Sequence, residues 1–242
     1  MRRFAPSSSA SSTPSRGEPA APAGGGGPVT GYADGIVEQF SGWSAGKSRH
    51  LFRRRLAAAL PFLPARGRAL DAGCGDLETR EFLRGRRPGL ELVGCDLGWV
   101  VGPRTVRADV QMLPFADGSF DAVLLLAVLE HVPQHEAALA EAHRVLRPAG
   151  VLVVTTPNPL YGLPMAVAGR IGLKYREGYD HGISLAALRR LAGGVGFEVE
   201  HEGRFLLLPF PSPLDRIEPW LARRRRLGRL LLNQLLVARR QA

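Results

Sequence analysis

Two acids and two glycines stand where two apolar segments end. In "LDAGCGD", Asp71 closes an apolar step and is followed by Gly73 and Gly75, and in "LVGCD" a second apolar step ends at Asp96. Glycines have no Cβ, so they allow a tight turn in which the backbone can approach a ligand closely. An acid at the end of the next strand can accept two hydrogen bonds from a ribose diol. These residue types in this order indicate a site for a nicotinamide or an adenosyl cofactor.

The charges around the turn discriminate between these two cofactors. A pyrophosphate-binding loop has the pattern GxGxxG, whereas this turn reads "GCGDLE", with Glu78 in place of the last glycine and a further acid at Asp76. Two carboxylates repel a diphosphate but attract the ammonium and sulfonium groups of S-adenosylmethionine. The charge therefore favours S-adenosylmethionine over a dinucleotide.

Strands and helices alternate along the middle of the chain, which predicts the scaffold that positions the turn. The fourth predicted strand is apolar throughout, as expected of a parallel strand covered on both faces. Alternation of this kind is typical of an open α/β sheet, in which ligands bind beyond the carboxyl ends of the strands. The predicted strands cover 68–72, 90–96, 105–109, part of 120–132 and 151–158; the predicted helices cover 48–60 (ended by "PFLP"), 77–85, 134–150 (stopped at Pro148 and Gly150) and a segment beginning near Ser184.

Length and composition predict one globular domain with an appendage. The chain has 242 residues, of which 45% are hydrophobic and 22% are charged, as in ordinary globular proteins. Residues 1–30 are rich in Ser, Pro, Ala and Gly, so burial cannot offset their ordering entropy, and we predict a disordered tail before a domain at 31–242. The opening twin arginines precede no hydrophobic region, which argues against export. Two cysteines without a CxxC spacing fit a reducing cytosol and indicate no metal site.

The net charge of +10 is concentrated near one end of the sequence. From Trp220 onward the chain carries seven arginines and no acid. Such a run can contact nucleic acid or an anionic membrane, but arginines that are simply solvated are the commoner explanation. We therefore keep membrane contact as an open alternative and disfavour nucleic acid as a partner.

Several motifs follow one another between residues 65 and 157: "ALDAGCGD", "LVGCDLG", "ADVQMLPFADGSFDAV", "LEHV" and "EAHRVLRPAGVLVVTTPN". In this order they resemble the class I S-adenosylmethionine-dependent methyltransferases, and among them the type 11 group that includes ubiquinone- and menaquinone-pathway enzymes. The resemblance implies a Rossmann-like α/β fold with a seven-stranded, mostly parallel sheet and helices on both faces. It also implies that the last strand, "QLLVARR", runs antiparallel between its neighbours.

The same resemblance assigns residues to the cofactor, S-adenosylmethionine. It implies that the turn from Gly73 to Gly75 approaches the methionine part. It further implies that Asp96 holds the ribose hydroxyls and that Asp109 meets the adenine amino group. The implied cofactor-binding residues are Asp71, Gly73, Cys74, Gly75, Asp96, Leu97, Asp109 and Val110.

Two departures from the family pattern concern details of this site. Leu77 stands where a glycine is usual, so the approach to the methionine carboxylate can differ. Asp96 and Val106 are so close in the sequence that the helix between the second and third strands has little room. Trp99 in that short connection could cover the adenine, or it could pack beneath the loop.

Two histidines, His131 and His181, are candidate catalytic bases. Methyl transfer from a sulfonium is mainly a matter of positioning the nucleophile, so a base is optional. His131 in "LEHV" follows the fourth strand, where an imidazole could take a proton, but it could also order the loop or pack against the cofactor. His181, with Tyr179 and Asp180, could orient or deprotonate an acceptor hydroxyl. Alternatively, this group is a capped turn with Ser184 as the N-cap.

Two irregular segments are predicted to cover the acceptor. Residues 158–183 are apolar, long and broken by glycines, as expected of a lid, and residues 205–233 add a second cover. Residues 214–238 could rest on anionic lipid or cap the pocket. That segment places four leucines on one predicted helical face opposite arginines: Leu227, Leu230, Leu231 and Leu235.

These patterns together predict a methyltransferase that acts on a small-molecule acceptor, with oxygen as the favoured acceptor atom. A lipid or quinone methyltransferase that docks on the inner face of the membrane is the first alternative. An RNA methyltransferase, whose RNA affinity would fall steeply with salt, and a noncatalytic adenosyl-binding protein stay open as well. The sequence identifies neither the acceptor nor the oligomeric state.

Overall fold

The computed structural model describes residues 49–75, 78–98, 102–162, 182–208, 211–224 and 226–241. Seven strands form the sheet: β1 (Arg66–Ala72), β2 (Gly89–Asp96), β3 (Thr105–Arg107), β4 (Phe120–Leu126), β5 (Leu146–Pro157), β6 (Phe197–Phe205) and β7 (Asn233–Arg240). The α-helices are α2 (Arg49–Ala59), α3 (Glu78–Arg84), α4 (His135–Val145), α6 (Leu185–Gly194) and α7 (Glu218–Arg223). Short 3-10 turns are η1 (Leu60–Phe62), η2 (Leu129–His131), η3 (Pro159–Tyr161), η4 (Pro213–Arg216) and η5 (Leu227–Leu230).

The strands lie in the order β3-β2-β1-β4-β5-β7-β6 in one sheet. Neighbouring strands from β3 to β5 pair in parallel, whereas β7 is antiparallel to both β5 and β6. This arrangement confirms the predicted seven-stranded sheet with its last strand reversed between its neighbours. Because β1, β2, β4 and β5 run in the same direction, their carboxyl ends meet at one edge, where ligands bind in open α/β sheets.

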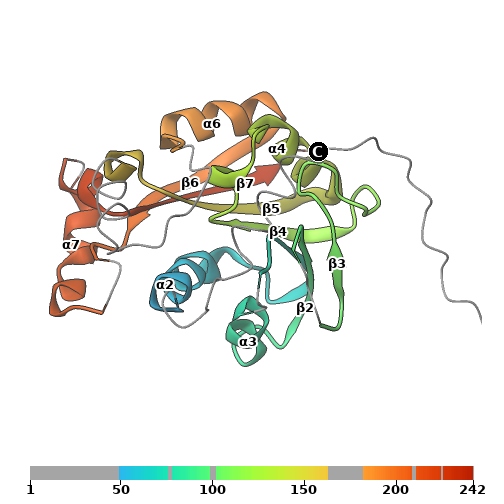
Figure 1. Ribbon diagram of the computed structural model, residues 1–242, viewed down its shortest axis with the longest axis horizontal. Coiled ribbons are helices and arrows are strands. Elements are labelled where there is room, and N and C mark those ends of the chain that lie inside the picture. Colours follow the sequence, from blue (N-terminus) through green and yellow to red (C-terminus); the bar gives the residue numbers. More distant parts are fainter. Residues whose placement is uncertain are drawn as a thin grey trace, which may run out of the picture.

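Helices cover both faces of the sheet, as predicted: α2 and α3 lie on one face and α4 and α6 on the other (Figure 1). The two faces of β4 enter different hydrophobic clusters, with Val123 and Leu125 on the α4 side and Ala122 and Leu124 on the α2 side. All four side chains are at most 1% exposed. Burial on both faces explains the unbroken apolar run of β4.

Local signals set several element boundaries where the sequence predicts them. Helix α2 buries Leu56 and Ala59 and passes into η1, which has a proline in its first turn. The hydroxyl of Ser184 accepts a hydrogen bond from the amide of Ala187 at 3.2 Å, which confirms Ser184 as the N-cap of α6. No helix in the described ranges has the length and apolar character needed to cross a membrane.

The predicted end of the helix before β5 is wrong. Helix α4 stops at Val145 instead of continuing to Pro148 and Gly150. The guanidinium of Arg240, on β7, donates to the carbonyls of His143 and Leu146, so the last turn is capped from the sheet. Leu146 then pairs with β4 and already belongs to β5.

The predicted leucine face of a C-terminal helix is also wrong. Leu227 and Leu230 lie in η5, Leu231 is fully buried after it, and Leu235 lies within β7. Because β7 pairs with strands on both sides, its residues up to Ala238 are buried, and the range 214–238 cannot rest on a membrane as a unit. Only the part before β7 reaches the surface.

Candidate functional site

A tight turn follows β1 and is hydrogen-bonded to the end of β2. The amides of Gly73 and Cys74 both donate to the carbonyl oxygen of Cys95, at 2.7 and 3.0 Å. Gly73 has φ +85°, and a Cβ placed there would lie 2.4 Å from Cγ2 of Val128, in the loop after β4. A Cβ on Gly75, which has φ +49°, would meet nothing within 4 Å. The first glycine is therefore required by packing, whereas the second faces open space.

The carboxylate of Asp96 joins the loops that follow β1 and β2. Its Oδ2 accepts a hydrogen bond from the Gly75 amide at 3.0 Å, and its Oδ1 accepts one from the Gly98 amide at 2.9 Å. A carboxylate has about four acceptor positions. Asp96 is therefore held in place by backbone amides and keeps capacity for ligand hydroxyl groups.

Asp109 follows β3, whose end pairs with the end of β2 at Asp96. The amide of Ala108 donates to the backbone oxygen of Asp96 at 2.9 Å, which brings the two loops together. The Asp109 carboxylate accepts hydrogen bonds from the amide and the side chain of Gln111. Val110 is 6% exposed and packs in the core, and the Leu97 carbonyl accepts a hydrogen bond from Arg107 at 2.9 Å.

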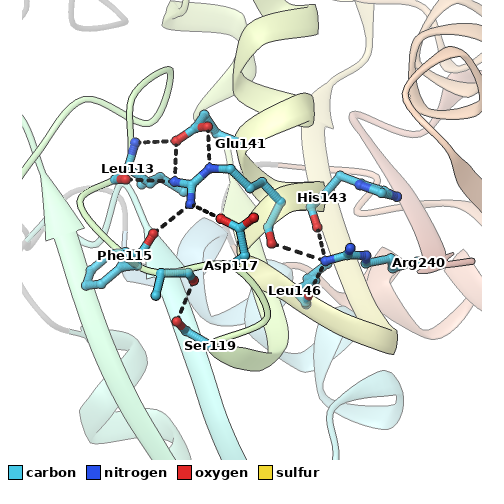
Figure 2. A network of polar contacts seen from close by, with 10 residues as sticks. Leu113, Phe115, Asp117, Ser119, Glu141, His143, Leu146 and Arg240 are labelled. Atoms are coloured by element: carbon cyan, nitrogen blue, oxygen red, sulfur yellow. Dashed lines mark hydrogen bonds and ion pairs between the residues drawn. The ribbon is translucent and has the colours of Figure 1, made fainter. Parts of the chain in front are cut away.

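A network centred on Arg144 of α4 holds the loop that carries Asp109. The Arg144 guanidinium donates to the carbonyls of Leu113 and Phe115, at 2.9 and 2.7 Å, and to Asp117 at 2.7 Å. Figure 2 shows these loop residues gathered beside Glu141, whose Oε2 accepts the Leu113 amide at 2.7 Å.

The ionic part of this network is the pair of Arg144 with Glu141. The side-chain bond from Arg144 holds the pKa of Glu141 below its usual value of 4.5, and the same bond raises the pKa of Arg144. Sequence reasoning missed both residues, because a polar pair spaced i, i+3 on an amphipathic helix is ordinarily a solvated face.

Two buried thiols, Cys74 and Cys95, lie at this edge. Burial raises the pKa of Cys74, and the nearby Asp71 and Asp96 carboxylates raise it further. Burial raises the pKa of Cys95 to about 12. Both thiols are therefore neutral at pH 7. Gly94 makes room for the first of them, since a Cβ on Gly94 would lie 2.8 Å from the Cys74 sulfur.

Of the two candidate bases, the structure describes His131. His131 is half-buried at the end of η2, directly after β4, and its amide donates to the Val128 carbonyl at 2.9 Å. Since Val128 also contacts the Gly73 turn, the structure brings the His131 loop to the same edge as Asp71 and Asp96. His181 lies outside the described residues, as do Tyr179, Asp180, Trp99, Asp76 and Leu77.

The seven-stranded sheet has the fold of the class I methyltransferases, and one segment of the chain matches a family model. Residues 70–154 match the model of the type 11 methyltransferase domain family. This segment of the chain is a class I S-adenosylmethionine-dependent methyltransferase domain.

Two curated relatives extend beyond the matched segment. The chain is 37% identical over 139 residues to the demethylmenaquinone methyltransferase of Thermus thermophilus, covering 51% of this chain and 59% of the relative. It is 30% identical over 168 residues to the fatty-acid O-methyltransferase of Mycolicibacterium smegmatis, covering 64% of this chain and 57% of the relative. The chain thus spans little more than half the length of these relatives.

A solved structure matches the fold over most of the chain. It is the 1,6-didemethyltoxoflavin-N1-methyltransferase of Burkholderia thailandensis, with bound 1,6-didemethyltoxoflavin and S-adenosylhomocysteine. The match has a TM-score of 0.58 and 19% identity and covers 87% of each chain. At this identity the likeness establishes the fold.

Proposed function

We propose that the chain transfers a methyl group from S-adenosylmethionine to an oxygen atom of a small-molecule acceptor. The observation that carries the proposal is the Asp96 carboxylate. It is fixed by the amides of Gly75 and Gly98, with Asp71 and Asp109 on the adjoining strand ends. Asp96 is the proposed partner of the ribose hydroxyls, and Asp109 of the adenine amino group.

The donor set along this edge fits the cofactor. Three acids favour a ligand with an ammonium and a sulfonium group and disfavour a diphosphate. Burial, and after it the Asp71 and Asp96 carboxylates, raise the pKa of the Cys74 thiol, so this thiol adds no negative charge beside them at neutral pH. The open space beside Gly75 lets backbone approach the methionine part. When bound, the cofactor supplies a methyl group that is already activated on sulfur.

The remaining task of the protein is to position the acceptor and, for a hydroxyl acceptor, to remove its proton. We propose His131 for that proton because it follows β4 at the same edge as the turn. A carboxylic acid acceptor, ionised at neutral pH, needs no base. His181 stays a predicted second candidate, and the segments 158–183 and 205–233 stay the predicted covers of the acceptor.

Oxygen is favoured as the acceptor atom because two relatives carry that activity in their names. Besides the fatty-acid enzyme, the malonyl-[acyl-carrier protein] O-methyltransferase of Laribacter hongkongensis is 33% identical to this chain over 138 residues. The demethylmenaquinone enzyme supports a quinol or quinone ring as the alternative acceptor class.

The test is transfer of a labelled methyl group from S-adenosylmethionine to a panel of fatty acids, phenols, reduced quinones and transfer RNA. We expect label in an organic-extractable small molecule. For a phenolic acceptor, we expect a large loss of turnover with cofactor affinity unchanged in His131→Asn. His143→Asn is the matched control, since His143 packs against Phe197 of β6, the outermost strand of the sheet. Label confined to RNA, or cofactor binding without transfer to any acceptor, would contradict the proposal.

A further inference from the structure

One end of the molecule exposes a cluster of large apolar side chains. Each is between 45% and 63% exposed, and they lie in η3, η4, α7 and η5 or, for Ile217, between η4 and α7: Leu160, Leu214, Ile217, Trp220 and Leu230. Within the described ranges, only two other large apolar side chains are comparably exposed, Val106 and Met112. We call these five residues the apolar end; α7 marks it at the left of Figure 1. Exposed apolar groups gathered in this way indicate an interaction surface.

The backbone beneath the apolar end is anchored to the rest of the fold. The Asn158 side chain donates to the carbonyls of Arg229 and Leu231, both at 2.8 Å, and the Tyr161 hydroxyl donates to the Leu230 carbonyl. Arg54 of α2 forms an ion pair with the buried Glu218 of α7. The exposed side chains are therefore presented by fixed segments.

Exposed arginines lie between these apolar side chains along residues 214–230: Arg216, Arg223, Arg224, Arg226 and Arg229. None of them forms an ion pair within the part of the chain that the structure describes. The two acids in the same stretch are already engaged, Glu218 with Arg54 and Asp215 with the amide of Ser212. The apolar end therefore carries a positive charge that its own acids do not neutralise.

We propose that the apolar end is a docking surface for an anionic lipid bilayer. Trp220, with Arg224 5.2 Å from its ring centroid, combines the aromatic ring and the cation that favour a membrane interface. Aliphatic side chains such as Leu214 and Ile217 gain from insertion among acyl chains, whereas a phosphate backbone offers them nothing. The mixture of exposed aliphatic groups and uncompensated arginines thus selects lipid over nucleic acid.

The topology places this surface at the functional edge of the sheet. Strands β5 and β6 end there, at Pro157 and Phe205, and β7 begins there, since Pro157 pairs with Asn233. The segment with η4, α7 and η5 leaves and re-enters the sheet at that edge. A docked bilayer would therefore adjoin the edge that carries Asp71 and Asp96. The docking proposal itself does not depend on methyl transfer.

The test is sedimentation of the full chain with vesicles of phosphatidylcholine alone or mixed with phosphatidylglycerol. We expect binding to the mixed vesicles that weakens as salt is added. Arg223→Gln with Arg224→Gln should lower that affinity about 25-fold, at about fivefold for each arginine. Leu214→Ser with Trp220→Ser should lower it about tenfold or more through lost apolar burial.

Matched control variants distinguish binding through this surface from nonspecific binding to vesicles. Arg53→Gln with Arg84→Gln removes two exposed arginines from α2 and α3, and Met112→Ser removes an exposed apolar side chain elsewhere. Both controls should bind vesicles as the wild type does. Three results would overturn the proposal: equal binding to neutral and anionic vesicles, an equal loss in the controls, or salt-sensitive RNA binding without vesicle binding.

Discussion

The charged side chains of the acidic carboxyl edge are buried or hydrogen-bonded, whereas the arginines of the apolar end are exposed and lack acidic partners among the described residues. At the edge, Asp71 is 2% exposed, and Asp96 is bonded to two backbone amides. At the apolar end, exposed arginines such as Arg223 and Arg229 are bound to no acid within the described residues. The two regions therefore carry opposite charges within a chain whose net charge is +10.

This difference determines how each group of charges can interact with a ligand or a surface. A carboxylate fixed by amides is already oriented, so it recognises a ligand without further ordering cost. An exposed arginine attracts an anionic surface at long range and gives little specificity. Substitutions at the edge should therefore reduce stability or cofactor affinity, whereas substitutions at the apolar end should leave the fold intact.

The largest effect is expected at Gly73. Alanine there must adopt φ +85° and would collide with Val128, so we expect Gly73→Ala to lower the free energy of unfolding by about 3 kcal/mol. Gly75→Ala, which meets no neighbour, should cost only about 1 kcal/mol. Urea denaturation followed by circular dichroism measures both. Equal losses would show that contact with Val128 does not set the turn.

Arg144→Gln should have the second-largest effect on the free energy of unfolding. It removes charge-assisted bonds to Asp117 and Glu141, and we expect a loss of about 2 kcal/mol in unfolding free energy. Because the same network holds the loop with Asp109, cofactor affinity should fall too. Arg190→Gln, an exposed arginine on α6, is the control and should change neither quantity. Normal stability of Arg144→Gln would show that the network does not stabilise the fold.

The lowered pKa of Glu141 predicts that the free energy of unfolding depends on pH. Its folded pKa lies below its ordinary value of 4.5, so its stabilising effect is present above about pH 4.5 and is lost as the pH falls through the folded pKa. Glu141→Gln should therefore be less stable than wild type by about 1 kcal/mol at neutral pH, with the difference shrinking below pH 4.5. Unfolding free energies measured across this range test the sign. A difference that grows on acidification would contradict it.

The smallest effect on folding is expected at the apolar end. Arg223→Gln with Arg224→Gln should change the free energy of unfolding by about 0.5 kcal/mol or less, because both side chains are exposed and lack an acidic partner within the described residues. Thermal and urea unfolding provide the measurement. A loss comparable to that of Arg144→Gln would mean that these arginines stabilise the fold, and the contrast between the two regions would fail.

The sequence predicted those parts of the molecule that depend on local pattern or on the family motifs. Apolar runs located β1, β2, β4 and β5, and Ser184 was correctly predicted as a helix cap. The placement of β7 between β5 and β6 came from the resemblance. The roles of the predicted cofactor residues, and of His131 and His181, stay predictions.

The features that could not be predicted from the sequence depend on contacts between residues far apart in the chain. Arg144 bonds to a carboxylate and a carbonyl that lie 27 and 31 positions away, and no local signal identifies such partners. The leucines from Leu227 to Leu235 fit a helical spacing, but pairing of β7 with two strands decided their structure. Tertiary contacts overrode the helical periodicity of the leucines, and they gave Arg144 partners that its position in a helix does not indicate.

Calorimetric titration with S-adenosylmethionine, S-adenosylhomocysteine and NAD tests most directly whether Asp96 holds an adenosyl cofactor. The proteins to compare are the wild type, Asp96→Ala and Glu91→Ala; Glu91 is a matched acid in the same strand but away from the edge. We expect adenosyl binding by the wild type and Glu91→Ala, an affinity about 100-fold lower for folded Asp96→Ala, and no binding of NAD. Folded wild-type protein that binds neither adenosyl ligand, or an Asp96→Ala protein that binds them normally, would contradict this expectation.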